Sequence, residues 1–215
     1  VIEHLHGKTE KGFIPNDNRG NGSKSFDRSQ PPVGGIMTKE VYKRYPEKWF
    51  LEATFDYLLG WNRWWVKDRL NEGLLSYGSS PSENPYHEPV FETKTAAGYE
   101  SGMDDSPMYI GVPFNREKHT LELQDVGLTS LYIADCHALA EMAEILGRSD
   151  ERNELLNRAE QLSYEMESLW DEDLGAYLNY RTDIDSHSSR VSPTLFYPLM
   201  AGVANIDRSK KIVDF

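Results

Sequence analysis

Two long amphipathic segments, separated by a very short linker, constrain the fold of this chain more than any other feature. In the first, apolar residues recur at helical spacing and the pattern ends at Gly147, the position where glycine commonly terminates a helix. In the second, Ser149 is the predicted cap, and apolar residues again share one face. The apolar positions are Val126, Leu131, Ala134, Leu139, Met142, Ala143 and Leu146, then Leu155, Leu156, Ala159, Leu162, Met166 and Leu169. So short a connection predicts an antiparallel helical hairpin.

The rest of the chain alternates helical patterns with long irregular segments. Thr38 is the predicted start of a short helix, Pro46 fits the first turn of a longer one, and Asp207 is the predicted cap of the last one. Irregular stretches cover residues 1–37 and 76–115. No run of alternating strands indicates a sheet. Helical pairs joined by short and long connections predict an all-α fold, an α/α solenoid or toroid.

Composition excludes several classes of partner. The net charge of −12, without clustered Lys and Arg, argues against nucleic acid. No apolar run approaches the roughly 18 residues of a membrane helix, so a soluble protein is expected, without an indicated location. Five Trp and twelve Tyr suit a neutral polar ligand. The start on Val1, without Met, suggests processing or a piece of a longer chain.

Isolated residues with reactive or aromatic side chains favour the core over chemistry. The single cysteine, Cys136, cannot form an internal disulfide and lies in an apolar helical pattern, which favours a buried inert thiol. Trp61, Trp64 and Trp65 on one long helix are more typical of a core than of a sugar platform. The six histidines lack zinc-ligand spacing, so no metal enzyme is predicted.

Residues 97–107, "AGYESGMDDSP", place three carboxylates in a predicted kinked loop. Hydrolysis of a glycosidic bond needs one protonated carboxylic acid and one ionised carboxylate on the opposite side of the sugar. The acid needs apolar surroundings or neighbouring carboxylates to stay protonated. Asp104 has both kinds of neighbour: Asp105 and Glu100 are close in sequence, and so are Tyr99, Met103 and Tyr109. An ordinary solvated acidic loop is the alternative interpretation.

Two polar segments near the start of the chain offer donors for sugar hydroxyls. Residues 28–32, "RSQPP", combine fork-shaped Arg and Gln donors with a stiff pair of prolines. Residues 12–19, "GFIPNDNR", add further polar groups beside an apolar anchor. Taken locally, an exposed polyproline turn is the alternative.

The order of five motifs resembles glycoside hydrolase family 63. These are "GFIPNDNR", "RSQPP", "ESGMDDSP", "ADCHALAEMAEILGR" and "RVSPTLFYPLMAGV", and together they extend across nearly the whole chain. The trehalases of family 37 share several of these motifs, but typically carry Trp where Met103 stands. The first two motifs are also similar to those of the smaller glycosylglycerate hydrolases of family 63.

The resemblance implies an (α/α)6 barrel, with residues 1–215 forming part of a single catalytic domain, and inversion of the anomeric configuration. By the same mapping Asp104 is the general acid, Asn16, Arg28 and Gln30 hold sugar hydroxyls, Gly102 lets the backbone approach the sugar, and Glu100 orients the loop from behind. The implied substrate is an α-glucoside or related oligosaccharide. Trehalose and mannosyl- or glucosylglycerate are the alternatives, and no cofactor is implied.

Two departures from the family pattern affect the expected function. The family's general base is a Glu well beyond "SPTLFYPL", and no position up to Phe215 matches it; about six helices are expected where a toroid has twelve. The remainder of the same catalytic domain is therefore an expected partner, and a non-catalytic carbohydrate-binding module is the alternative from another class. Some family members bind Ca²⁺ after the long helix. Asp68, Asn71 and Glu72 lie there without alternating oxygen ligands, so a solvated helix end is favoured over calcium.

Overall fold

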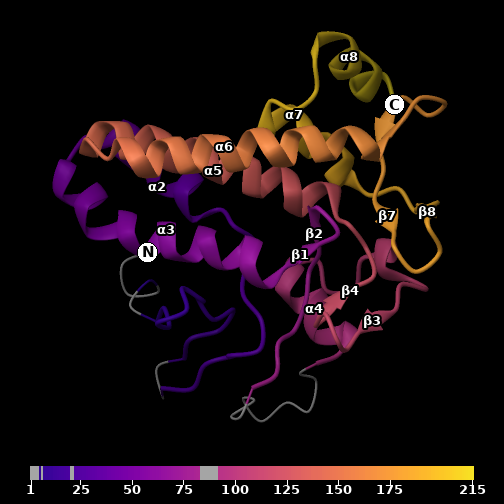
Figure 1. Ribbon diagram of the computed structural model, residues 1–215, viewed down its shortest axis with the longest axis horizontal. Helices are drawn as coiled ribbons and strands as arrows, with labels where there is room; N and C mark the ends of the chain where they lie inside the picture. Colours follow the sequence, from indigo (N-terminus) through magenta and orange to yellow (C-terminus); the bar gives the residue numbers. More distant parts are fainter. Residues whose placement is uncertain (1–4, 6, 20–21, 83–91) are drawn as a thin grey trace.

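The computed structural model describes residue 5 and residues 7–19, 22–82 and 92–215, and its long helices lie side by side above a layer of irregular segments (Figure 1). The predicted irregular segment 1–37 is thus only partly within this range. The α-helices are α2 (Gly34–Arg44), α3 (Lys48–Asp68), α4 (Lys94–Ser101), α5 (Val126–Leu146), α6 (Ser149–Glu165), α7 (Tyr197–Ala201) and α8 (Ile206–Asp214). Short 3-10 helices cover Pro107–Tyr109, Met166–Leu169 and Pro193–Phe196. The predicted all-α class is confirmed.

The predicted hairpin is formed by α5 and α6. Asp125 caps α5 by accepting a hydrogen bond from the Leu128 N–H at 2.8 Å, and Gly147 ends the helix in the left-handed conformation with φ +76°. Ser149 is not the cap of α6, as the sequence suggested, because Arg148 occupies that position and Ser149 is already helical. The helix begins this early because the Arg148 N–H closes the end of α5 by donating to the Ala143 carbonyl.

The boundaries of three other helices differ from prediction by a few residues. Thr38 lies buried inside α2, which begins at Gly34, and Pro46 lies two residues before α3 rather than in its first turn. The cap of α8 is Asn205, whose side-chain oxygen accepts from two backbone N–H groups, while Asp207 lies in the first turn. In each case the sequence located the helix to within a few residues but not its first residue.

Residues 97–101 were predicted as part of an irregular loop and instead belong to α4. Thr93 starts this helix because its hydroxyl accepts from the Ala96 N–H at 3.2 Å, and Gly102 ends it with φ +67°. Only the remainder of the predicted loop, from Gly102 to Ser106, is irregular before the next 3-10 turn. The two glycines made the segment appear unfavourable for a helix, although Gly98 fits there.

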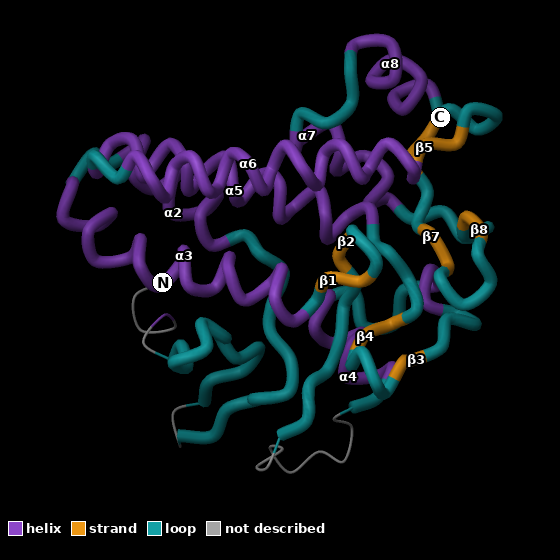
Figure 2. Tube along the Cα trace, in the orientation of Figure 1, coloured by secondary structure: helices purple, strands orange, loops and turns teal. Residues whose placement is uncertain are grey.

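Short antiparallel hairpins lie within the connections between helices (Figure 2). They pair β1 (Leu70–Asn71) with β2 (Leu74–Leu75), β3 (Phe114–Asn115) with β4 (Thr120–Leu121), β5 (Trp170–Asp171) with β6 (Ala176–Tyr177), and β7 (Tyr180–Arg181) with β8 (Ser186–His187).

The core lies between α3 and α5 and extends under α6. Trp61, Trp64 and Trp65 are buried within it, as predicted. Cys136 is fully buried, and burial raises the pKa of its thiol to about 12, so the inert role predicted for it is consistent with its surroundings. Among the described helices, none combines the length and the apolar character needed to cross a lipid bilayer.

Candidate active site

A polar pocket with a volume of about 560 Å³, called here the Asp104 pocket, lies among the irregular segments. It is lined by Asn16, Asp17, Arg19, Arg28, Gln30, Tyr99, Gly102 and Asp104. The fold therefore brings together five of the six residues singled out from the sequence, from segments far apart along the chain. The sixth, Glu100, lies behind the pocket wall.

Asp104 lies in the short turn between α4 and the 3-10 helix Pro107–Tyr109, and its side chain is exposed. The Ser101 hydroxyl accepts from the Met103 N–H at 3.0 Å, and the Ser106 N–H donates to the Met103 carbonyl at 2.9 Å. Gly102 permits this turn because it adopts φ +67°, a conformation that other residues rarely adopt. These bonds fix the backbone on both sides of the Asp104 carboxylate.

Asn16 joins two walls of the pocket. Its amide nitrogen donates to the carbonyls of Ser29 at 3.0 Å and Tyr99 at 3.1 Å, while the Gln30 amide donates to the Asn16 carbonyl at 3.3 Å. Both amide hydrogens of Asn16 are thus committed to backbone. What its side chain offers to a ligand is the carboxamide oxygen.

Arg28 is held between a carboxylate and an aromatic ring. Its Nη1 donates to both oxygens of Asp27 at 3.0 Å, and its guanidinium carbon lies 5.1 Å from the centre of the Tyr99 ring. Asp27 is itself buried and accepts from the Ser79 hydroxyl at 2.9 Å. The guanidinium therefore reaches the pocket from a rigid support.

Glu100 accepts four hydrogen bonds directly behind the pocket. Arg69 donates from Nε at 2.7 Å and from Nη2 at 2.9 Å, and both side chains are fully buried. The backbone N–H groups of Gly78 and Ser29 donate at 2.7 and 2.8 Å. The bidentate ion pair ties the end of α4 to Arg69, and the two backbone bonds tie it to the segments that contain Gly78 and Ser29. Ser29 lies directly between Arg28 and Gln30 in the sequence.

The sequence did not single out Tyr99, Asp17 or Arg19 as site residues, although all three line the pocket and Arg19 pairs with Asp17. The sequence did contain a signal for them, because each lies within a few residues of a predicted site residue. Arg69 carries no comparable signal, since it pairs with Glu100 across 31 residues of sequence.

Two of the three residues considered for calcium, Asn71 and Glu72, have another partner. The Lys118 ammonium donates to the Asn71 side-chain oxygen at 3.0 Å and to the Glu72 carboxylate at 2.7 Å. Across the described ranges, no group of three or more His, Cys, Asp and Glu side chains is arranged to hold a metal ion. The Lys118 cation already contacts the oxygens of Asn71 and Glu72, and calcium needs about six to eight oxygen ligands, so these residues do not fit a calcium site.

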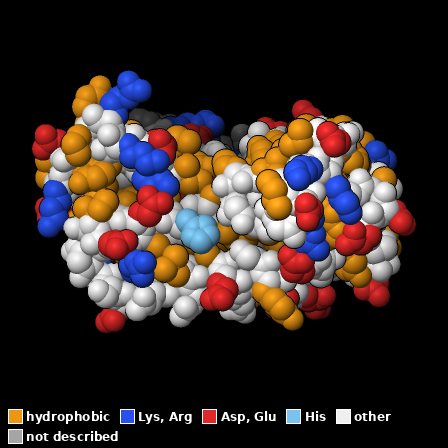
Figure 3. Space-filling model, turned by 90° about the horizontal axis from the view of Figure 1, so that it is seen from above, with side chains coloured by type: hydrophobic (Ala, Val, Ile, Leu, Met, Phe, Trp, Pro, Cys, Tyr) orange, Lys and Arg blue, Asp and Glu red, His pale blue; other side chains and the backbone are white. Residues whose placement is uncertain are grey.

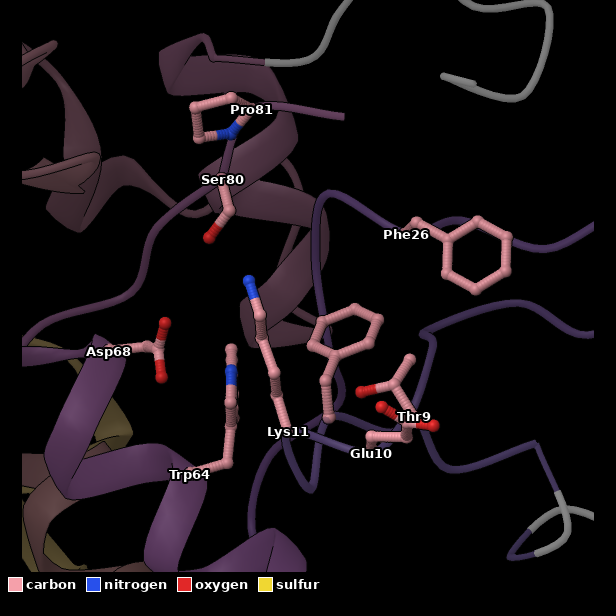
Figure 4. A pocket seen from close by; sticks show the side chains of 9 residues that line it. Thr9, Glu10, Lys11, Phe26, Trp64, Asp68, Ser80 and Pro81 are labelled. Atoms are coloured by element: carbon pink, nitrogen blue, oxygen red, sulfur yellow. The ribbon is translucent and has the colours of Figure 1, made fainter. Parts of the chain in front are cut away.

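A second cavity of about 430 Å³, called here the Trp64 pocket, lies beside α3 and contains none of the predicted site residues. The Lys11 side chain extends past the Trp64 ring with its nitrogen between Asp68 and Ser80 (Figure 4). Phe26 lines this cavity, whereas Arg28, two residues later, lines the Asp104 pocket. Residues two apart in this segment thus line different cavities.

Two solved structures with the same fold are a mannosylglycerate hydrolase and a trehalase. The family 63 mannosylglycerate hydrolase from Thermus thermophilus, in complex with glucose, aligns with a TM-score of 0.75 at 18% identity, over 98% of this chain and 61% of its own. The neutral trehalase from Saccharomyces cerevisiae aligns with a TM-score of 0.68 at 18% identity, over 87% of this chain and 43% of its own. The predicted (α/α)6 barrel fold, of which this chain covers a part, is confirmed.

The comparisons of the sequence also find glycoside hydrolases. A trehalase from Oryctolagus cuniculus is 26% identical over 224 residues, which cover 90% of this chain and 38% of the relative. The chain thus spans less than two thirds of the length of each of these relatives. A family model described as the mannosylglycerate hydrolase MGH1-like glycoside hydrolase domain matches residues 3–214, nearly the whole chain. The chain belongs to this glycoside hydrolase family.

Proposed function

We propose that this domain hydrolyses a glycoside with inversion, and that Asp104 is the general acid. The observation that carries the proposal is the Asp104 pocket, where this carboxylate lies together with the donors Arg28 and Gln30 and the oxygen of Asn16. Such a set suits a sugar ring, because hydroxyls need both donors and acceptors, while the carboxyl group meets the bridging oxygen.

In the proposed reaction Asp104 donates its proton to the glycosidic oxygen as the bond to the anomeric carbon breaks. A water molecule, activated by a general base, attacks that carbon from the opposite face of the ring. We assign the base to no residue of this chain; the family pattern places it in a Glu further along. Since Asp104 is exposed here, the exclusion of water that the acid needs would come from the bound sugar and from further helices.

Exposed apolar residues support the proposal that further helices of the same domain pack on this chain. Figure 3 views the side on which α7 and α8 lie, where hydrophobic side chains appear among charged ones. On and around these helices Phe196, Met200, Ile206, Val213 and Phe215 are between 43% and 70% exposed. This much apolar surface is typical of a face that another element covers.

The proposed substrate is a small α-glycoside. An α-glucoside was the first expectation from the sequence, with trehalose and mannosyl- or glucosylglycerate as alternatives. The names of the relatives support trehalose and mannosylglycerate among these. A panel of trehalose, glucosylglycerate, mannosylglycerate and glucose disaccharides, incubated with the protein expressed from its complete reading frame, distinguishes them by which one is turned over.

The substitution Asp104→Asn tests the role of the acid. We expect kcat to fall by about 10²–10⁴, because the variant cannot protonate the leaving oxygen. With a glycosyl fluoride as substrate, kcat of this variant should fall much less, since fluoride leaves without a proton. Asp105→Asn is the matched control, because Asp105 is also exposed but does not line the pocket, and it should stay within a few-fold of wild type.

Equal losses in the two variants would contradict the assignment of Asp104, and so would turnover of natural glycosides by Asp104→Asn at near the wild-type rate. The alternative of a non-catalytic binding module predicts another outcome. In that case calorimetry detects sugar binding, while no member of the panel is hydrolysed by the wild-type protein.

A further inference from the structure

The segment that carries Arg28 and Gln30 leads directly into α2, and the start of α2 lacks a cap of its own. Val33 occupies the cap position and its side chain accepts no hydrogen bond. The first N–H groups of a helix need acceptors from elsewhere. Asp135, at the centre of α5, supplies one, because its Oδ1 accepts from the Gly35 N–H at 2.7 Å.

Asp135 is itself held in one orientation. Its second oxygen accepts from the Asn62 amide of α3 at 3.0 Å, and Asn62 Oδ1 accepts from the Tyr132 hydroxyl and from Arg158, both at 2.9 Å. Asp135 is 2% exposed and Asn62 is 1% exposed. A buried polar chain from α6 and α3 therefore ends on the first turn of α2.

The start of α2 packs against Asp135 and Leu139 of α5 without room for a side chain on Gly35. A Cβ atom on Gly35 would lie 2.8 Å from Asp135 Oδ1 and 2.8 Å from Leu139. At the other end of the segment, the Trp61 indole N–H donates to the Ser29 hydroxyl at 2.9 Å. Residues 29–35, with two prolines between, are thus attached at both ends to the helical core.

We infer that Asp135 and Asn62 are positioning residues that hold Arg28 and Gln30 in register with the Asp104 pocket. The inference rests on the proposed function, in which these donors bind the sugar. Asp104 is held separately, by α4 and its own turn. Weakening the Asp135–Asn62 pair should therefore raise KM about tenfold and leave kcat within about threefold.

The test uses the chemical asymmetry of the pair. In Asp135→Asn, an NH₂ group that donates replaces one of the two accepting oxygens. In one orientation of the new amide this group faces the Gly35 N–H, and in the other it faces the Asn62 NH₂ group, so two donors meet in each case. In Asn62→Asp, two carboxylates face each other. The exchange Asp135→Asn with Asn62→Asp restores an acceptor for Gly35 and a donor–acceptor pair between the side chains. Arg158 and Tyr132 then donate to the new carboxylate.

The readouts are KM and kcat for the panel substrate that wild type hydrolyses fastest, and the dissociation constant for glucose by calorimetry. The inference is supported when Asp135→Asn raises KM about tenfold and the exchange restores it to within about threefold. Leu162→Ala, which removes buried apolar contacts on α6, is the control for lost stability, and at a similar Tm it should keep the wild-type KM.

The inference is overturned if Asp135→Asn keeps the wild-type KM, if Leu162→Ala raises KM equally, or if the folded exchange variant remains tenfold impaired. If Asp135→Asn fails to fold, the KM of the exchange variant alone decides: a value within about threefold of wild type supports the inference, and a tenfold higher value overturns it. A wild-type protein that binds glucose without turnover overturns the proposed catalysis, and the dissociation constants then decide the positioning inference. A wild-type protein that does neither overturns both.

Discussion

Two buried carboxylates in this chain are stabilised in different ways. Glu100, behind the Asp104 pocket, accepts from the charged fork of Arg69 and from two backbone N–H groups. Asp135, where α2, α3 and α5 meet, accepts from the neutral groups Asn62 and Gly35, and burial raises its pKa to about 7. The pocket wall thus depends on a compensated charge, whereas the helix junction tolerates a carboxylate whose charge is only partly favoured.

Removing the cation at Glu100 gives the largest expected effect on stability. Arg69→Leu leaves a fully buried carboxylate without its ion pair, and we expect the free energy of unfolding to fall by about 3–5 kcal/mol in urea titrations. Arg63→Leu, within α3, the helix that ends just before Arg69, is the control. It breaks a solvent-exposed pair with Glu154, which is worth at most about 1 kcal/mol.

Replacing both partners sharpens this comparison. Arg69→Leu combined with Glu100→Leu removes the uncompensated charge, so part of the lost stability should return. If the single Arg69 variant is as stable as the Arg63 variant, the pair does not compensate a buried charge in the way argued here.

The sequence predicted the features that depend on local signals and missed those that depend on contacts between distant residues. The α5–α6 hairpin was predicted because repeated apolar positions and a terminal glycine are local signals. The start of α2 was misplaced because its first turn is capped by Asp135, 100 residues away in sequence. No local pattern reports a cap borrowed from another helix.

The candidate site shows the same limit. Asn16, Arg28 and Asp104 were singled out through the ordered motifs, and the fold brings them into one pocket, but their chemical roles stay predictions. The supports of the pocket, Arg69 behind Glu100 and Trp61 behind Ser29, were missed as such. They act through pairings between distant segments, which one sequence does not reveal.

The pH dependence of stability distinguishes the two carboxylates further. The pKa of Asp135 is about 7 in the folded chain against 3.8 as its ordinary value, so the folded state binds more protons than the unfolded state between these pH values. Stability must then fall as pH rises through this window, by up to about 1.4 kcal/mol per pH unit from this group alone.

Comparing wild type with Asp135→Asn isolates that contribution, since other carboxylates titrate in both proteins. The charged and titratable groups around the pair are Arg158, which stays cationic, and Cys136 and Tyr132, whose pKa values are raised by burial and which stay neutral. The difference in unfolding free energy should shrink with rising pH between about 4 and 7. A constant difference across this range would show that Asp135 does not titrate there.

The last expected effects concern the glycines whose N–H groups donate to these carboxylates. A Cβ on Gly78, beside Glu100, would lie 2.3 Å from the His119 carbonyl oxygen, a backbone atom. On Gly35 it would meet side-chain atoms at 2.8 Å. We expect Gly35→Ala to lower the free energy of unfolding by about 1–3 kcal/mol, and Gly78→Ala to cost more, because backbone adjusts less readily than side chains.

Gly60→Ala is the matched control for both glycines. It lies inside α3, and its added methyl group would meet only the flexible end of Lys8, with Nζ at 2.9 Å. Alanine favours a helix over glycine by about 1 kcal/mol, so this variant should be neutral or slightly more stable in the same titrations. If Gly35→Ala behaves like Gly60→Ala, then α2 has room to move away from Asp135, and the close approach is not what fixes the start of that helix.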